Sequence, residues 1–376
     1  MQQWKRLKCN VNEISARCDH GVVVLGPYAY IFGGCTGPVS SMACSPDLIC
    51  FDFKARRCIK IKCAGEKPSG RASFAMCKGP DKGTLILAGG TGDDGLPRGD
   101  IWEYNSLSRK WNRLFLSDGG LASTFCRLYG QSVCCYGRSL IFFGGSSGKC
   151  YSNEVFKFDV DTLQYEQLKT KGTAPYARYK HQANIVGNKM FIFGGGNYLP
   201  STKNIDVFCL DFETLRWNKV NALGQEPQAR VAHTTVMDEI SNKIYLWGGF
   251  NTSLNRLQDF FCFDIITSTW TALHCNKTSS YCPSPRAFHA SCIYGDGIFI
   301  FGGANEENRY SDVWKYLVRH NPLSLMVLAT RATLSTSGAC QNKCLGKMPI
   351  EVFSTDTDLN LGSEGFISPV KKLIGI

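Results

Sequence analysis

Six glycine doublets, spaced almost evenly along the chain, constrain the fold more than any other feature of this sequence. Each doublet follows a short apolar run, although strands usually avoid glycine because it costs backbone entropy and adds no side-chain packing. The first glycines of the doublets are Gly33, Gly89, Gly144, Gly194, Gly248 and Gly302. Their intervals of 56, 55, 50, 54 and 54 residues predict a repeat architecture built from stacked units of about 50 residues.

The residues between successive doublets repeat too, and they predict a unit of four strands. A segment with an arginine precedes a short strand ahead of each doublet, at Arg17, Arg71, Arg127, Arg178, Arg230 and Arg286. After each doublet, a polar loop leads into a strand of alternating pattern, such as "VFKFDV" (Val155–Val160). An aromatic residue opens the fourth strand at Trp111, Tyr165, Trp217 and Trp270, whereas the first unit has Cys58 there. Such a unit cannot bury its own faces and has to stack on its neighbours.

The sixth unit lacks a fourth strand of its own, but the chain begins with one that no unit uses. Trp4 in "QQWKRLKC" is placed as Trp111 is placed in "RKWNRLFL". We therefore expect residues near Trp4 to complete the blade built from residues 286–318. That pairing closes a ring and removes the open sheet edges.

On these six repeats, residues 1–320 resemble the kelch β-propeller family. The resemblance implies an all-β fold, a six-bladed kelch propeller closed by an N-terminal strand and followed by a tail over residues 321–376. The doublets are expected where a strand turns away from the central shaft, because glycine has no Cβ and tolerates close backbone approach there. We expect a short helix over residues 321–334 and a loosely ordered remainder of the tail.

Composition narrows the class of protein further. No apolar run is long enough for a membrane span, and the first residues lack the apolar core of a signal peptide, so we expect a cytoplasmic or nuclear protein. The 19 cysteines are then expected to be reduced and buried, and no pair of CxxC knuckles predicts zinc. The net charge of +11 favours a solvated basic surface or a basic mouth suited to an acidic partner. No basic run interleaved with aromatic residues predicts a nucleic-acid site.

Function is expected in the loops, which gather at the two ends of a propeller. If the arginine segments and the loops after the doublets emerge at one end, up to nine cations surround one opening, with Arg98, Arg256 and Arg309 from the second set. Recurrence within every unit favours an architectural role for most of the arginines and for His20, His181, His233 and His289. We find no nucleophile elbow, phosphate loop or Cys–His pair, and expect neither an enzyme nor a cofactor.

The tail carries a second resemblance. Ser324-Leu325 followed by Ala329 resembles the elongin-binding box of BTB-less kelch proteins that are substrate receptors of cullin-RING ubiquitin ligases. The resemblance implies elongin B, elongin C and cullin-2 as partners, and capture of substrate C-terminal peptide degrons ending in glycine by a cationic propeller pocket. Transferred by motif position, the peptide-binding residues are Arg256, Arg309, Arg178, Tyr179, Lys180 and Arg230.

Two other functions stay open at this stage. The propeller is alternatively a non-catalytic scaffold for a cytoskeletal or trafficking partner, in which residues 321–334 only cap the underside of the ring. A metal-dependent propeller enzyme is a third, remote hypothesis. It would require a tyrosine–histidine set on the axis, whereas the histidines here recur with the repeat.

Overall fold

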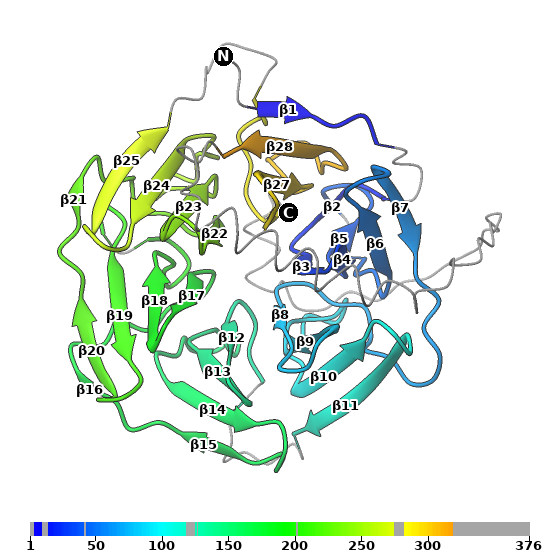
Figure 1. Ribbon diagram of the computed structural model, residues 1–376, viewed down its shortest axis with the longest axis horizontal. Helices are drawn as coiled ribbons and strands as arrows, with labels where there is room; N and C mark the ends of the chain where they lie inside the picture. The colour runs from blue at the N-terminus through cyan, green and yellow to red at the C-terminus, as the bar shows by residue number, and fades with distance from the viewer. Residues whose placement is uncertain are drawn as a thin grey trace, which may run out of the picture. The chain divides into compact units, whose positions relative to one another are not determined.

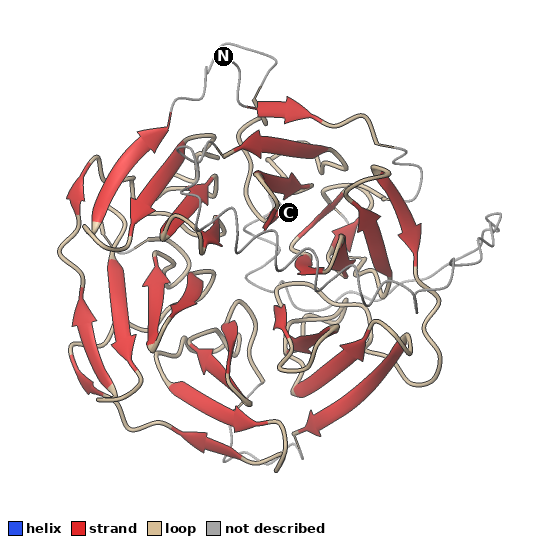
Figure 2. Cartoon of the chain, in the orientation of Figure 1, coloured by secondary structure: helices blue, strands red, loops and turns tan. Residues whose placement is uncertain are grey.

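The computed structural model describes residues 4–9, 14–40, 43–117, 125, 127–200, 202–273 and 282–318, and every regular element among them is a β-strand (Figure 1). These residues form six mainly antiparallel sheets arranged as blades around a central shaft, which confirms the predicted six-bladed propeller (Figures 1 and 2). The helix predicted over residues 321–334 lies outside the described residues.

Each blade begins with its innermost strand and ends with its outermost. Blade 1 contains β3 (Gly21–Leu25), β4 (Tyr28–Phe32), β6 (Leu48–Asp52) and β7 (Arg57–Lys60). Blade 2 contains β8 (Ala75–Lys78), β9 (Thr84–Ala88), β10 (Asp100–Asn105) and β11 (Lys110–Leu116). Blade 3 contains β12 (Ser132–Tyr136), β13 (Ser139–Phe143), β14 (Val155–Asp159) and β15 (Tyr165–Gln167).

Blades 4 and 5 each gain a short fifth strand that runs parallel to the outermost one. Blade 4 contains β17 (Gln182–Val186), β18 (Lys189–Phe193), β19 (Val207–Asp211), β20 (Arg216–Lys219) and the added β16 (Lys171–Gly172). Blade 5 contains β22 (Thr234–Asp238), β23 (Lys243–Trp247), β24 (Phe260–Asp264), β25 (Thr269–Leu273) and the added β21 (Leu223–Gly224). A small separate sheet pairs β2 (Arg17–Cys18) with β5 (Cys35–Thr36).

Blade 6 joins the two ends of the propeller, as the sequence predicts. It contains β26 (Ala290–Tyr294), β27 (Gly297–Phe301), β28 (Val313–Leu317) and β1 (Trp4–Arg6). The strands β1 and β28 are antiparallel, with Trp4 opposite Tyr316. The Trp4 side chain is buried, and its ring centroid lies 5.0 Å from Tyr316 and 5.3 Å from Phe260 of blade 5. The closing strand therefore contributes to the core between blades 5 and 6.

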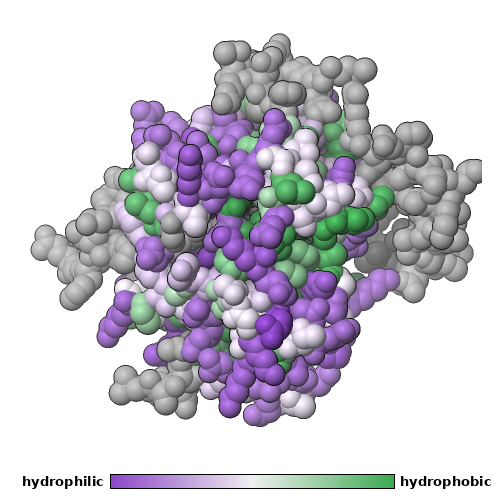
Figure 3. Space-filling view, turned by 90° about the vertical axis from the view of Figure 1, so that its left-hand side faces the viewer, coloured by the Kyte–Doolittle hydropathy of each residue, from purple (hydrophilic) through white to green (hydrophobic). Residues whose placement is uncertain are grey.

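The core consists of apolar layers between neighbouring blades. Ile141, Phe143 and Val155 of blade 3, for example, pack with Met190, Ile192, Phe208 and Trp217 of blade 4. The strands are apolar on both faces for this reason, since each sheet is covered on two sides. Hydrophilic residues cover most of the circumference over blades 4 and 5, with smaller groups of hydrophobic residues between them (Figure 3).

The second glycine of each doublet ties its blade to the next one. In all six cases its N–H donates to the main-chain carbonyl that opens the inner segment of the following blade: Gly34 to Arg71, Gly90 to Leu128, Gly145 to Arg178, Gly195 to Arg230, Gly249 to Arg286 and Gly303 to Arg17, at 2.8–3.0 Å. This pattern corrects one sequence assignment. Leu128, not the exposed Arg127, occupies the arginine position of blade 3.

The glycine doublets lie so close to neighbouring segments that they leave no room for a side chain. A Cβ on Gly195 would lie 2.6 Å from the Cβ of His181 and 2.8 Å from the carbonyl oxygen of Tyr179. Gly194 and Gly195 also have φ of 56° and 83°, a region that glycine alone enters at little cost.

The cysteines are mostly free thiols within the strands and loops, as the sequence predicts. Fourteen of the described cysteines are free, including Cys134, Cys135, Cys209, Cys262 and Cys292 in strands. Cys282 departs from the prediction because it is disulfide-bonded.

Candidate functional site

Both predicted loop sets emerge at the same end of the propeller, where each innermost strand begins and each second strand ends at its doublet. We call this the loop end. Short β-bridges connect the two sets, between Tyr179 and Gly196 and between Val231 and Phe250, and a further bridge within the loop after the fifth doublet joins Phe250 to Arg256. Residues from the arginine segments and from the loops after the doublets therefore share one surface.

The recurrent arginines do not line an opening at this end. The Arg178 guanidinium is buried and donates from Nη1 to Gly194 O at 2.7 Å and to Asp206 Oδ1 at 2.8 Å, and from Nη2 to Asp206 Oδ2 at 2.9 Å. Arg230 repeats the arrangement with Gly248 O and Asp259. Such bidentate pairs hold the doublet to the third strand of the same blade. The side chains thus brace single blades, while the arginine carbonyls join neighbouring blades.

Arg309, predicted as a loop cation for a peptide, is also engaged within the propeller. Its side chain is 8% exposed. It donates to a row of main-chain carbonyls in the loop that follows the first doublet: Thr36 at 2.6 Å, Gly37 at 3.3 Å, Pro38 at 2.8 Å and Val39 at 3.4 Å. Arg309 therefore fixes the loop of blade 1 against blade 6 at the loop end.

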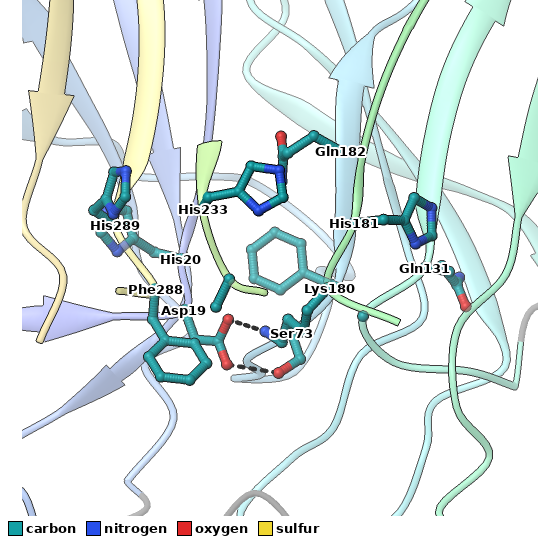
Figure 4. A pocket seen from close by; sticks show the side chains of 13 residues that line it. Asp19, His20, Ser73, Gln131, Lys180, His181, Gln182, His233, Phe288 and His289 are labelled. Atoms are coloured by element: carbon teal, nitrogen blue, oxygen red, sulfur yellow. Dashed lines mark hydrogen bonds and ion pairs between the residues drawn. The ribbon is translucent and has the colours of Figure 1, made fainter. Parts of the chain in front are cut away.

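Lys180 is committed to an ion pair across the shaft. Its Nζ contacts the carboxylate of Asp19, which also accepts a hydrogen bond of 2.6 Å from the Ser73 hydroxyl (Figure 4). Nζ lies 5.2 Å from the ring centroid of Phe288 as well. We call the Asp19–Lys180 pair the axial bridge, since it joins blade 1 to blade 4. Residues at this level line a cavity of about 110 Å³ in the shaft.

The axial bridge lies on a closed ring of main-chain hydrogen bonds. Six residues, one from each blade, each donate an N–H to the carbonyl of the residue before them in the ring, at 2.7–3.2 Å: Asp19, Ser73, Gly130, Lys180, Ala232 and Phe288. All six have φ between 53° and 65°, so five non-glycine residues adopt a conformation that glycine prefers. The ring holds the inner segments in one register around the shaft.

The four recurrent histidines lie between blades, in agreement with their predicted architectural role. His181 Nε2 is 2.9 Å from the Ser132 hydroxyl of blade 3, and His289 Nε2 is 2.7 Å from the Thr234 hydroxyl of blade 5. Burial, with a nearby arginine, lowers the pKa of His20 and His181 to about 3. These imidazoles are therefore neutral at physiological pH and pack against the glycine doublet of the preceding blade.

Arg256 occupies a different environment from the other predicted cations. Its guanidinium is half-buried, lies 5.0 Å from the ring centroid of Phe250 and donates to Leu254 O at 3.1 Å. Partial burial lowers the pKa of Arg256, while the Glu306 carboxylate, the Cys18 thiol and the Tyr198 hydroxyl act in the opposite direction. A guanidinium stacked on an aromatic ring and partly removed from water is well suited to bind a carboxylate.

Tyrosines gather beside Arg256 at the loop end, and most of this group was missed by the sequence analysis. The buried Tyr179 ring lies 5.2 Å from Tyr151 and 6.1 Å from Tyr129. Tyr198 packs against the apolar cluster that contains Tyr129, Tyr179 and Phe250. The Tyr179 hydroxyl is buried and has no hydrogen-bond partner within the described residues. Such a hydroxyl can still form a hydrogen bond with a water molecule or with a ligand atom.

The sequence offered one usable signal for this group. Tyr129 occupies the same repeat position as Tyr179, directly after the residue whose carbonyl joins two blades. Tyr151 and Tyr198 come from loops of unequal length after the doublets, so no register predicts where their rings lie. Phe250 and Glu306 were missed for the same reason.

Other site types find little support in the described part of the chain. No cluster of three or more His, Cys, Asp or Glu residues there is arranged to hold a metal ion. The same residues contain no helix long and apolar enough to cross a membrane. Ser324, Leu325 and Ala329, which the sequence predicts to bind elongin C, lie outside the described residues.

Comparison with known proteins now identifies the family. Residues 1–124, 122–198 and 180–340 match the family described as the KLHDC2/KLHL20/DRC7 Kelch-repeats domain. The chain belongs to the kelch-repeat family. Kelch domain-containing protein 3 of Homo sapiens is 26% identical to this kelch propeller over 306 residues, covering 77% of the chain and 78% of that relative.

Two further relatives extend the comparison. Kelch domain-containing protein 10 of Rattus norvegicus is 27% identical over 325 residues, covering 80% of the chain and 75% of the relative. Kelch domain-containing protein 2 of Bos taurus is 26% identical over 253 residues, or 60% of each chain. Kelch propellers are generally non-catalytic modules for protein interaction, and the fold and the relatives support that general role for this chain.

Proposed function

We propose that this kelch protein is a substrate receptor of a cullin-RING ubiquitin ligase, in which the propeller binds the C-terminal peptide of a substrate at the loop end. The observation that carries the proposal is one cluster at the loop end, in which Tyr179 with its orphaned hydroxyl packs with Phe250 and Tyr198, and the Arg256 guanidinium lies over the Phe250 ring. In this proposal the Arg256 guanidinium pairs with the terminal carboxylate and the Tyr179 hydroxyl binds the last peptide unit.

The electrostatics favour a carboxylate over a neutral group. Charge-assisted hydrogen bonds strengthen where water is partly excluded, and Arg256 is half-buried beside Phe250. The rings of Tyr151 and Tyr179 pack in the same apolar cluster as Phe250, over which the Arg256 guanidinium lies. A wall that closes on the last residue favours glycine, because any Cβ would clash.

The remaining predicted residues support this surface rather than contact the peptide directly. Arg309 holds the neighbouring loop through four carbonyls. Arg178 and Arg230 brace blades 4 and 5 through Asp206 and Asp259. Lys180 closes the shaft below Tyr179 through Asp19. A carboxylate that competed for these groups would have to displace an internal partner.

The ligase half of the proposal depends on the tail sequence. The Ser324-Leu325 pair followed by Ala329 supplies the box that would bind elongin C, with elongin B and cullin-2 assembling through it. Leu325 is the expected anchor, since a buried apolar side chain dominates contacts of this size.

A peptide-binding assay tests the receptor half. Labelled peptides that end in glycine are titrated against the full chain with either a free or an amidated C-terminus. We expect binding only with the free carboxylate, and Arg256→Glu should remove about 2–5 kcal/mol of binding free energy. Arg138→Gln, at the far end of blade 3, is the matched control and should leave binding unchanged. Equal affinity for amidated peptides would overturn the carboxylate role.

A co-purification assay tests the ligase half separately. The full chain should retain elongin B and elongin C, and Leu325→Asp should abolish the complex while peptide binding persists. If the wild-type chain retains neither elongin but still binds peptides, the ligase role is wrong and the propeller is an interaction scaffold.

A further inference from the structure

The positive charge of this protein is concentrated on one part of its circumference. The outermost strands of blades 6, 1 and 2 and their flanking turns, residues 4–9, 54–67 and 107–116, contain 12 Lys or Arg residues and a single acidic residue, Glu66. The basic residues are Lys5, Arg6, Lys8, Lys54, Arg56, Arg57, Lys60, Lys62, Lys67, Arg109, Lys110 and Arg113. These segments thus carry a net charge of +11, equal to that of the entire chain. We call them the cationic arc.

The corresponding segments of the other three blades carry no net charge. Residues 160–172, 212–226 and 265–273 of blades 3, 4 and 5 contain four basic residues, Lys169, Lys171, Arg216 and Lys219, and four acidic residues, Asp161, Glu166, Glu213 and Glu226. The outer strand of a blade in this propeller therefore does not require a basic composition.

The cationic arc extends without interruption over three neighbouring blades. Strands β1, β7 and β11 are the outermost strands of three consecutive blades (Figure 1). Trp4, Cys58 and Trp111 on these strands are buried, so alternation directs the neighbouring cations outward. All but one of the cations are exposed, and Arg109 is half-buried.

Charged side chains on an edge strand commonly prevent aggregation, and that explanation is insufficient here. The edge of blade 2 is already paired at its first residue, where Ala64 forms a parallel bridge to Lys110, yet Arg109, Lys110 and Arg113 cluster at this end of the strand. Two carboxylates of the same blades show what the cations bind. Asp47 lies 2.8 Å from Lys60, and Glu66 lies 2.8 Å from Arg113.

We propose that the cationic arc is a second interaction surface, which docks an acidic segment of a partner protein on the side of the propeller. Charge complementarity carries this inference, and it goes beyond the peptide site at the loop end. Within the arc segments no aromatic side chain is exposed, whereas single-stranded nucleic acid is bound by stacking on aromatic rings. Among the large hydrophobic residues of the arc segments, only Leu107 and Leu116 of blade 2 are exposed, so the arc lacks the apolar face of an interfacial membrane surface.

Fluorescence anisotropy with a labelled peptide of alternating glutamate and serine tests the proposal on the full chain. We expect binding that weakens at least about tenfold when salt rises from about 0.1 M to about 1 M, as the Debye length falls from ~10 Å to ~3 Å. The double variant Lys5→Glu/Arg57→Glu should weaken binding at least about tenfold, because it reverses charge on two adjacent blades. The matched control Arg216→Glu/Lys219→Glu reverses two charges on blade 4 and should leave the affinity unchanged.

Three results would overturn the proposal. The first is no binding of the glutamate peptide. The second is equal loss of binding in the blade 4 control. The third is tighter binding of duplex DNA or of vesicles containing phosphatidylserine than of the peptide, which would assign the arc to a different anionic partner. Arg256→Glu should leave this interaction intact, so failure here and failure of the loop-end site are distinguishable. Equal melting temperatures of the variants and the wild type would show that they fold.

Discussion

Asp19 of blade 1 and Lys180 of blade 4 form an ion pair across the shaft, between two blades that are three positions apart in a ring of six. Both side chains are about nine-tenths buried. The pair lies on the ring of six main-chain hydrogen bonds, so the shaft is closed at the loop end by charge as well as by backbone.

The axial bridge should be important for stability. Lys180→Met leaves the Asp19 carboxylate buried, with a hydrogen bond from the Ser73 hydroxyl but no cation beside it, and loss of one member of a buried ion pair costs about 3–5 kcal/mol. The double variant Asp19→Asn/Lys180→Met should regain part of that loss, because no charge is left buried. Urea denaturation of the four proteins gives the coupling free energy directly. A Lys180→Met protein as stable as the wild type would mean that solvent replaces the bridge.

Gly195 and Gly187 give a matched pair for the cost of a side chain at a doublet. Both have positive φ, 83° and 59°, but a Cβ on Gly187 would meet nothing within 4 Å. We expect Gly187→Ala to cost about 1 kcal/mol from the backbone alone. Gly195→Ala should cost well over 1 kcal/mol, and Gly195→Val more, since the Cβ would also contact His181. Thermal denaturation distinguishes them. Equal costs would show that the doublet is retained for its dihedral angles only.

Tyr179→Phe separates binding from stability. The variant removes a buried hydroxyl that has no partner among the described residues, so the melting temperature should stay the same or rise slightly. Peptide affinity should fall by about 1 kcal/mol, the net value of one hydrogen bond. A lower melting temperature would reveal an internal role for the hydroxyl, whereas unchanged affinity would remove Tyr179 from the proposed pocket.

The buried histidines predict how stability depends on pH. An unfolded histidine takes up a proton near pH 6.5, whereas His181 in the folded protein does so only at about pH 3. The unfolded state therefore binds more protons between these values, and the free energy of unfolding should fall as the pH drops from about 6.5. His181→Gln should reduce this slope by up to about 1.4 kcal/mol per pH unit. Denaturation curves at pH 7, 6 and 5 test this, and a slope equal to that of the wild type would contradict it.

Much of the fold was predictable because the glycine doublets and the aromatic residues of the fourth strands keep a fixed register. Trp4 matched Trp111 by local sequence alone, and the strand pairing of Trp4 with Tyr316 confirms the predicted closure. The error at Arg127 has a simple cause. An arginine one residue from the expected position looked like a sixth copy, whereas the hydrogen bond from Gly90 to Leu128 defines the register.

The site was less predictable because side-chain partners lie far away in sequence. The recurrence of Arg178 indicated architecture, but the pairing with Asp206 required knowledge of where the loop after the doublet returns to the blade. Asp19 and Lys180 are 161 residues apart in the sequence, far more than the 28 residues between Arg178 and Asp206. Cations at the mouth of the ring were a reasonable expectation from the net charge, but the structure places most of that charge on the outer strands of three blades.

The pairing of β1 with β28 also affects how the chain is made. Trp4 leaves the ribosome 312 residues before Tyr316, its partner in the sheet. At ~5–20 residues per second this separation corresponds to roughly 15–60 s of synthesis. During that interval five blades can stack in order, while a strand with a large aromatic side chain waits without its partner. The closing strand can therefore reach its buried position only after the last blade has been made.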